Sequence, residues 1–254
     1  MSGRRGIHYW KCDRAAAFHG TGEEREKADV EALLLAELQR QHPAQRITLH
    51  PFGSQGNHLT WHLEQDDAKL FVRVEDGPEH DDYFLAEWRV LDDVRALGLP
   101  VPQVHAVDAR RVRVPFAWQV MDRIDAPDLN HWHKQGRLNL DDAAEKIGAA
   151  VARWQEVQPD RFGPFDTAAV KSRQCLIGLH PRYGDYFLLN LDRHLGFLCD
   201  HAFLSTAEAT EMSTEIGRHH ALLDLPRGCL VHKDLALWNI LGNEREILAF
   251  IDWD

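Results

Sequence analysis

The hydrophobic pattern changes its period part-way along the chain, and this change limits the folds that are possible. Between residues 47 and 121, apolar and polar side chains alternate in short runs, the pattern of half-buried strands. We predict strands at 47–52, 57–63, 70–75, 104–107 and 116–121, with one helix at 80–97 between the third and the fourth. Beyond residue 121 the apolar positions recur at helical spacing, which predicts helices at 141–158, 183–201 and 206–223. A sheet followed by helices indicates an α+β fold with two lobes and a cleft between them.

The same pattern divides the chain into three parts. Residues 1–45 hold an N-terminal segment and a helix predicted at 23–41. The apolar stripe of that helix is expected to be Val30, Leu33, Leu34 and Leu38. Residues 46–124 form the sheet-bearing lobe, and residues 125–254 form the helical lobe. The helical lobe returns to short strands near its end, predicted at 229–231, 239–241 and 247–251.

Composition excludes several classes of protein. The chain has 254 residues, 44% of them hydrophobic, which is enough for a full core. Its formal net charge of −11 argues against a nucleic-acid partner. No apolar run approaches the ~18 residues that a membrane span needs, and no secretory signal is recognisable, so we expect no membrane partner. The 4 cysteines form no CxxC pair, which is typical of reduced thiols in a cytoplasmic protein. The oligomeric state is left open.

An arginine and a glutamate of the sheet-bearing lobe are expected to meet. Alternation in the run LFVRVE puts Arg73 on the face opposite the aliphatic side chains of its strand. Glu87 falls inside the stripe expected to be buried on the following helix, which is Phe84, Trp88, Leu91 and Val94. A carboxylate in that position needs a partner, and Arg73 is the obvious candidate. On these residues alone, a purely structural ion pair is the simpler interpretation.

The turn FGSQGN, residues 52–57, joins the first two predicted strands. Its two glycines and its serine allow backbone N–H groups to face an anion such as a phosphate. A glycine-bearing hairpin turn without any ligand is equally compatible with these residues and more common.

The most specific stretch is VHKDLALWNILGNEREILAFIDWD, residues 231–254. Asp234, Asn239 and Asp252 stand between apolar runs and are expected to meet at one rim. The amide and carboxylate oxygens of Asn239 and Asp252 suit Mg²⁺ held together with substrate phosphates. Asp234 could accept a hydroxyl proton or orient a nucleophile. Three polar residues that cap turns are the alternative, but the HxDxxxxN pattern with an aspartate 13 residues after the asparagine disfavours it.

The stretch HKDLALWN followed by ILAFIDWD resembles the catalytic loop and metal-binding aspartate of the aminoglycoside phosphotransferase and choline kinase family. These enzymes are small-molecule relatives of protein kinases. FGSQGN resembles their nucleotide loop, LFVRVE their third strand and AEWRVL their ion-pairing helix, while FAWQVMDRIDAPDL resembles the hinge between the lobes. The resemblance covers residues 47–254 and implies a protein-kinase-like two-lobed fold. In that fold an antiparallel five-stranded sheet with one helix precedes a mainly helical lobe.

The resemblance also implies roles, with ATP (or GTP) and Mg²⁺ as cofactors and a small-molecule hydroxyl as acceptor. Asp234 would be the catalytic base, Asn239 and Asp252 the Mg²⁺ ligands, and His232 a structural member of the loop. The nucleotide-binding residues would be Ser54 and Gly56 over the phosphates, Arg73 and its partner Glu87, and Met121, Asp122 and Ile124 beside adenine.

Three features depart from the family's pattern. Arg73 stands where many antibiotic kinases have lysine, although arginine keeps the charge and can pair bidentately. Lys233 stands where the family usually has glycine, and its ammonium could meet a phosphate. The family normally continues past the IDW motif with helices that complete the acceptor pocket, so we expect a chain truncated at its C-terminus.

The motifs and the family resemblance leave two possible functions. The first is an ATP-dependent phosphotransferase that moves the γ-phosphate to a hydroxyl of an aminoglycoside-like antibiotic, an amino alcohol or a sugar. The alternative is a catalytically impaired nucleotide-binding pseudokinase, or an incomplete domain that acts through a partner. A protein kinase is disfavoured because the chain has no DFG, no APE and no room for an activation segment.

Overall fold

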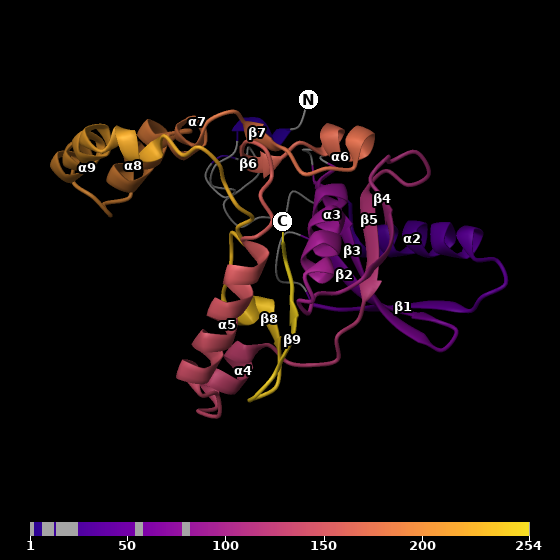
Figure 1. Ribbon diagram of the computed structural model, residues 1–254. Helices are drawn as coiled ribbons and strands as arrows, with labels where there is room; N and C mark the ends of the chain where they lie inside the picture. The colour runs from indigo at the N-terminus through magenta and orange to yellow at the C-terminus, as the bar shows by residue number, and fades with distance from the viewer. Residues whose placement is uncertain (1–2, 7–12, 14–24, 54–57, 78–81, 254) are drawn as a thin grey trace.

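The computed structural model describes residues 3–6, 13, 25–53, 58–77 and 82–253. A five-stranded antiparallel sheet in the order β1-β2-β3-β5-β4 forms the N-terminal lobe (Figure 1). Its strands are β1 Ile47–Pro51, β2 Leu59–Gln65, β3 Ala68–Glu75, β4 Val104–Asp108 and β5 Ala117–Asp122. The helices α2, Lys27–Gln41, and α3, Tyr83–Ala96, lie on opposite faces of this sheet. A short 3-10 turn, η1, covers Gly3–Gly6.

Helix α2 buries its apolar side on one face of the sheet, where it packs against Trp61, Val72, Val74, Trp118 and Val120. Val30, Leu34 and Leu38 are buried as predicted, but Leu33 is 42% exposed because it lies at the edge of the stripe. Glu37 is buried in its place. Hydrogen bonds from Arg40 and Gln41 satisfy this carboxylate, and the bond from Arg40 is the main reason why the pKa of Glu37 is lowered to about 2.

Helix α3 lies on the opposite face, and Glu87 falls inside its buried stripe as predicted. The stripe consists of Tyr83, Phe84, Ala86, Glu87, Val90, Leu91 and Val94. Trp88 was expected in this stripe, but it is 40% exposed, because one residue beyond Glu87 the helix has already turned its side chains by about 100°. Ala86 and Val90, two residues to either side of it, are 0% and 1% exposed.

The C-terminal lobe is mainly helical, with two short two-stranded sheets. Its helices are α4 Leu129–Lys134, α5 Leu140–Trp154, α6 Thr167–Arg173, α7 Tyr183–Phe187, α8 Leu191–Asp200 and α9 Thr206–Arg218, followed by the 3-10 turn η2 His220–Leu223. One sheet pairs β6 Phe162–Phe165 with β7 Gly178–His180, with α6 between the two strands. The other is a hairpin of β8 Ile240–Gly242 and β9 Ile247–Phe250. A 3-10 turn, η3 Leu237–Asn239, leads into β8. Helices α7, α8 and α9 extend away from the sheet (Figure 1).

Several predicted elements of this lobe were wrong in detail. The helix predicted at 183–201 is two helices, broken where Asn190 takes a left-handed φ of 61°. Residues 229–231 form no strand, since the N–H of Leu230 bonds to the carbonyl of Val157 in an irregular segment. Residues 162–165 form the strand β6, where no strand was predicted.

The two lobes share one apolar core. Val90 and Leu91 of α3 pack in the same cluster as Trp154 of α5 and Phe250 of β9. The N–H of Phe250 also donates to the carbonyl of Pro100, in the loop after α3, at 2.9 Å. The β8–β9 hairpin is therefore fixed against the N-terminal lobe at the end where β9 finishes.

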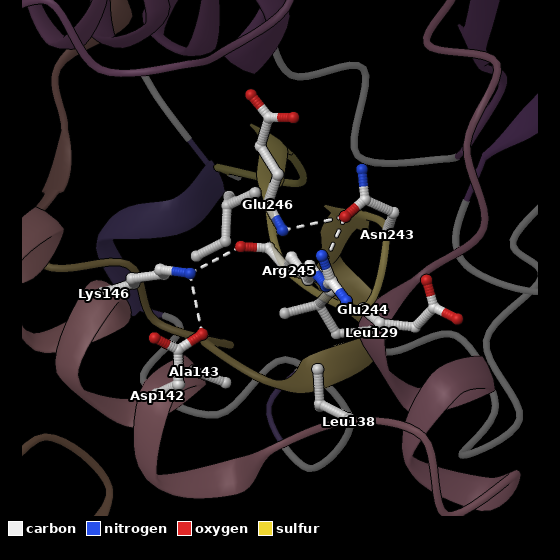
Figure 2. A pocket seen from close by; sticks show the side chains of 10 residues that line it. Leu129, Leu138, Asp142, Ala143, Lys146, Asn243, Glu244, Arg245 and Glu246 are labelled. Atoms are coloured by element: carbon white, nitrogen blue, oxygen red, sulfur yellow. Dashed lines mark hydrogen bonds and ion pairs between the residues drawn. The ribbon is translucent and has the colours of Figure 1, made fainter.

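The far end of this hairpin is closed by its own turn (Figure 2). The side-chain oxygen of Asn243 accepts from the N–H groups of Arg245 and Glu246, both at 2.9 Å. Lys146 of α5 lies across the turn and donates to Asp142 at 2.7 Å and to the carbonyl of Arg245. The hollow beneath has a volume of about 10 Å³, room for no more than one water molecule, so it holds neither a nucleotide nor an acceptor.

Among the residues that the structure describes, no helix is both long and apolar enough to cross a membrane.

Candidate active site

His232 anchors the loop that leads from the irregular segment into η3. Its ring is buried, and Nε2 lies 2.8 Å from the carbonyl oxygen of Ile251. The indole of Trp253 packs against it with ring centroids 4.6 Å apart, and Trp154 packs against Trp253 at 5.0 Å. The loop is therefore held to the segment that follows β9, which brings residues 232–239 and 251–253 together.

Asp234 and Asn239 meet within this loop. The amide Nδ2 of Asn239 donates to the backbone oxygen of Asp234 at 2.8 Å and to its carboxylate Oδ2 at 3.1 Å. Because both bonds use the amide hydrogens, the amide oxygen of Asn239 is the atom left for a ligand. Asn239 itself is buried, whereas the carboxylate of Asp234 is exposed at the rim. This arrangement suits a fixed metal ligand beside an accessible base.

Asp252 takes an unusual backbone conformation directly after β9. Its φ of 67° lies in the left-handed region, which costs a non-glycine residue about 1–3 kcal/mol. The carboxylate Oδ1 lies 3.0 Å from Nη2 of Arg73, while the side chain stays 42% exposed. The backbone turn thus directs a carboxylate of the C-terminal lobe at a cation of the N-terminal lobe.

Arg73 connects two carboxylates through its planar fork. Nη1 donates to Oε1 of Glu87 at 2.5 Å, and Nη2 donates to Asp252. Glu87 is only 1% exposed, so this pair is taken out of water. A lysine has a single nitrogen, whereas the two terminal nitrogens of the guanidinium let Arg73 reach both carboxylates at once. The predicted pairing of Arg73 with Glu87 is present in the structure.

Three residues of this region were missed by sequence reasoning. Nδ1 of His58 lies 2.9 Å from Nη2 of Arg73, and Gln119 donates to Glu87 at 3.3 Å. Gln119 lies opposite Arg73 on the same face of the sheet, in the β3–β5 register that the structure shows. Trp238 is the third, with its indole nitrogen 3.4 Å from Oδ2 of Asp234.

The hinge residues lie where β5 ends. Met121 is buried and pairs in register with Phe71 of β3. The N–H of Asp122 donates to the carbonyl of Gln103 at 2.9 Å, and its carboxylate lies 2.7 Å from His105, so both groups serve to hold β4. Of the two backbone hydrogen-bonding groups of Asp122, the carbonyl is the one that could accept a hydrogen bond from a nucleotide base. The carbonyl of Ile124 accepts from Ala126 at 2.9 Å in a tight turn.

Aromatic rings cover the sheet face on the same side as Arg73. Phe52 stacks on His62 with centroids 4.2 Å apart and meets the edge of Phe71 at 5.7 Å. Burial lowers the pKa of His62, and the nearby charge of Arg123 lowers it further. Neutral rings on this face offer a surface on which the base of a nucleotide can stack. Ser54 and Gly56, predicted to cover the phosphates, lie outside the described residues.

No group of three or more histidine, cysteine or acidic side chains within the described part of the chain could hold a metal ion by itself. Asn239 and Asp252 offer one amide oxygen and one carboxylate. This donor set fits Mg²⁺, which keeps several waters and is completed by substrate phosphates in its octahedral shell.

Comparisons with known proteins bear on this geometry. The model of the phosphotransferase enzyme family matches residues 48–254, most of the chain. The chain belongs to this phosphotransferase family. The predicted family resemblance is therefore confirmed. No curated protein matches this phosphotransferase.

Solved structures of other phosphotransferases share the fold. The aminoglycoside phosphotransferase APH(4)-Ia aligns with a TM-score of 0.60 at 16% identity, covering 87% of this chain and 71% of that chain. A proposed aminoglycoside phosphotransferase from Ralstonia eutropha aligns with a TM-score of 0.56 at 18% identity, covering 90% and 64%. A proposed fructosamine-3-kinase from Haemophilus somnus gives 0.51 at 14% identity, covering 84% and 69%. The predicted kinase-like α+β fold is confirmed.

Proposed function

We propose that this phosphotransferase transfers the γ-phosphate of ATP to a hydroxyl group of a small molecule. One observation carries the proposal. Two pairs of side chains lie in contact, Asp234 with Asn239 and Arg73 with Asp252. Together they supply a base, metal ligands and a cation, and they come from the loop, the N-terminal lobe and the segment after β9. Structures of APH(4)-Ia in complex with AMP-PNP and hygromycin B, and with ADP and hygromycin B, support nucleotide and acceptor binding by this fold.

Phosphoryl transfer asks the protein mainly for positioning and charge. The guanidinium of Arg73 would contact the α- and β-phosphates while Glu87 keeps it in place. Bound Mg²⁺, held by Asn239, Asp252 and the phosphates, would neutralise their charge. The acceptor oxygen would form a bond to the γ-phosphorus as the bond to ADP breaks, and its proton would pass to the carboxylate of Asp234.

The nucleotide base would lie between the hinge and the aromatic rings of the sheet. The Asp122 carbonyl and the Ile124 N–H would bond to adenine, with Met121 and Phe71 packing against the ring. GTP is the second nucleotide to test, since aminoglycoside 2'-phosphotransferase-IIIa has been solved as a GDP complex. The acceptor would be an aminoglycoside-like antibiotic, an amino alcohol or a sugar.

The pseudokinase alternative has one observation in its favour. The carboxylate of Asp252 already pairs with Arg73. To bind Mg²⁺, it must turn away from the guanidinium or contact the guanidinium and the metal at the same time. Thermal melting with Mg-ATP, followed by ATP consumption with candidate acceptors, separates the two functions. Stabilisation by Mg-ATP together with consumption supports an enzyme, whereas stabilisation without consumption by any acceptor supports the alternative.

Replacing Asp252 with asparagine is expected to weaken Mg-ATP binding about tenfold and to leave the weak binding of Mg-free ATP unchanged. Asparagine tolerates the left-handed backbone but removes the charge that attracts the cation. Isothermal titration with and without Mg²⁺ measures both constants. Asp200→Asn, an exposed residue of α8, is the matched control. An equal dependence on Mg²⁺ in both variants would argue against Asp252 as a ligand.

A further inference from the structure

Trp238 is an aromatic side chain at the rim of the active site that no role described above explains. It lies in η3, four residues after Asp234, and is 55% exposed. An exposed tryptophan by itself needs no explanation. This one, however, directs its indole N–H at Oδ2 of Asp234 over 3.4 Å, a long hydrogen bond to the proposed base.

The two oxygens of the Asp234 carboxylate have different surroundings. Oδ2 receives the indole N–H of Trp238 and the amide of Asn239, the latter at 3.1 Å. Both groups act there only as donors, so neither can take a proton from an acceptor. No residue in the described part of the chain donates to Oδ1. One oxygen is held by two donors, and the lone pairs of the other remain available for an incoming hydroxyl.

The backbone around Trp238 keeps the indole in reach of the carboxylate. The N–H of Ala236 donates to the carbonyl of Asp234, and the N–H of Asn239 donates to the carbonyl of Ala236, both at 2.9 Å. The loop from 234 to 239 is thus closed on itself by short bonds. Asn239 is buried, which fixes the position from which the preceding indole extends.

We propose that Trp238 is a positioning residue, which with Asn239 fixes the rotation of the Asp234 carboxylate so that Oδ1 faces the acceptor hydroxyl. The inference rests on the proposed function, in which Asp234 is the base. With the amide of Asn239 as its single side-chain donor, the carboxylate could rotate about that one hydrogen bond. The indole N–H of Trp238 donates from another direction and so fixes the plane of the carboxylate. Orientation of this kind acts on the chemical step and leaves nucleotide affinity untouched.

The test separates the N–H group from the ring. Trp238→Phe keeps an aromatic ring and removes the donor, whereas Trp238→His keeps a ring N–H. Steady-state hydrolysis of Mg-ATP, with water as the acceptor, is measured at pH 8, where a histidine is neutral. We expect Trp238→Phe to lower kcat about fivefold with KM for ATP unchanged, and Trp238→His to restore most of it. Trp88→Phe, a half-exposed tryptophan of α3, is the control and should match the unsubstituted chain.

Each outcome decides the inference. An unchanged kcat in Trp238→Phe, or an equal loss in both variants, would overturn a role for the N–H donor. A change in KM for ATP alone would also overturn it, because it would place Trp238 at the nucleotide. If the unsubstituted chain binds Mg-ATP but transfers phosphate neither to water nor to any candidate acceptor, the proposed function fails first, and the role of Trp238 fails with it.

Discussion

Asp234→Ala is expected to lower the rate of phosphoryl transfer by about 10²–10⁴-fold while Mg-ATP binds nearly as before. The carboxylate would take the proton of the acceptor hydroxyl. Of the described residues, the side chains that contact it are Trp238 and Asn239, and both present only N–H groups, so neither can replace it. Asp234 is exposed, so its removal leaves the core intact. The measurement is kcat for transfer, together with the dissociation constant of Mg-ATP by titration calorimetry.

The matched control for Asp234→Ala is Asp200→Ala, an exposed aspartate of α8 outside the site. It should have the kcat of the unsubstituted chain. Transfer at that same rate by Asp234→Ala would remove Asp234 from the reaction. A large loss of nucleotide affinity with little loss of kcat would assign it to binding instead.

Arg73→Ala is expected to lower the free energy of unfolding by about 3–5 kcal/mol and to abolish measurable binding of ATP. The substitution leaves the buried carboxylate of Glu87 without its guanidinium, and the 3.3 Å bond from Gln119 cannot replace a charge. The cation proposed for the phosphates disappears at the same time. Urea denaturation measures the first effect and calorimetric titration the second.

A double variant separates the buried charge from the general loss of packing. Arg73→Ala combined with Glu87→Ala removes both charges. The double variant should therefore lose less free energy of unfolding than the sum of the losses in the two single variants. The pair Arg89–Asp93, at 2.5 Å and only partly buried on α3, supplies the comparison. Arg89→Ala should cost less than about 1 kcal/mol. Strict additivity at Arg73 and Glu87 would contradict a desolvated, interdependent pair.

Periodicity predicted the fold and the pairing of Arg73 with Glu87, because a strand and a helix each fix the direction of every side chain they carry. The same reasoning failed at the edges of the stripes. Leu33 and Trp88 are each adjacent in sequence to a buried residue, Leu34 and Glu87, but are themselves 42% and 40% exposed. The break at Asn190 was missed because asparagine adopts a left-handed φ within an otherwise helical pattern.

The candidate site was less accessible to sequence reasoning than the fold. The motif spacing brought Asp234, Asn239 and Asp252 into consideration, since they lie in one stretch of chain. The contact of Arg73 with Asp252 joins segments 179 residues apart in sequence and depends on how the two lobes pack together. The contact of His58 with Arg73 depends on the register of β2 against β3. The left-handed turn at Asp252 gives no signal in composition or period.

The appearance of phosphate on an acceptor tests the central claim most directly. The unsubstituted chain is incubated with Mg-ATP and, separately, with an aminoglycoside such as hygromycin B, a macrolide and an amino alcohol, and each reaction is followed by ³¹P NMR. We expect a new phosphate monoester signal with at least one acceptor, growing in step with ADP and absent with Asp234→Ala. ATP that binds without consumption by any acceptor, release of inorganic phosphate alone, or an ester formed equally by Asp234→Ala would contradict it.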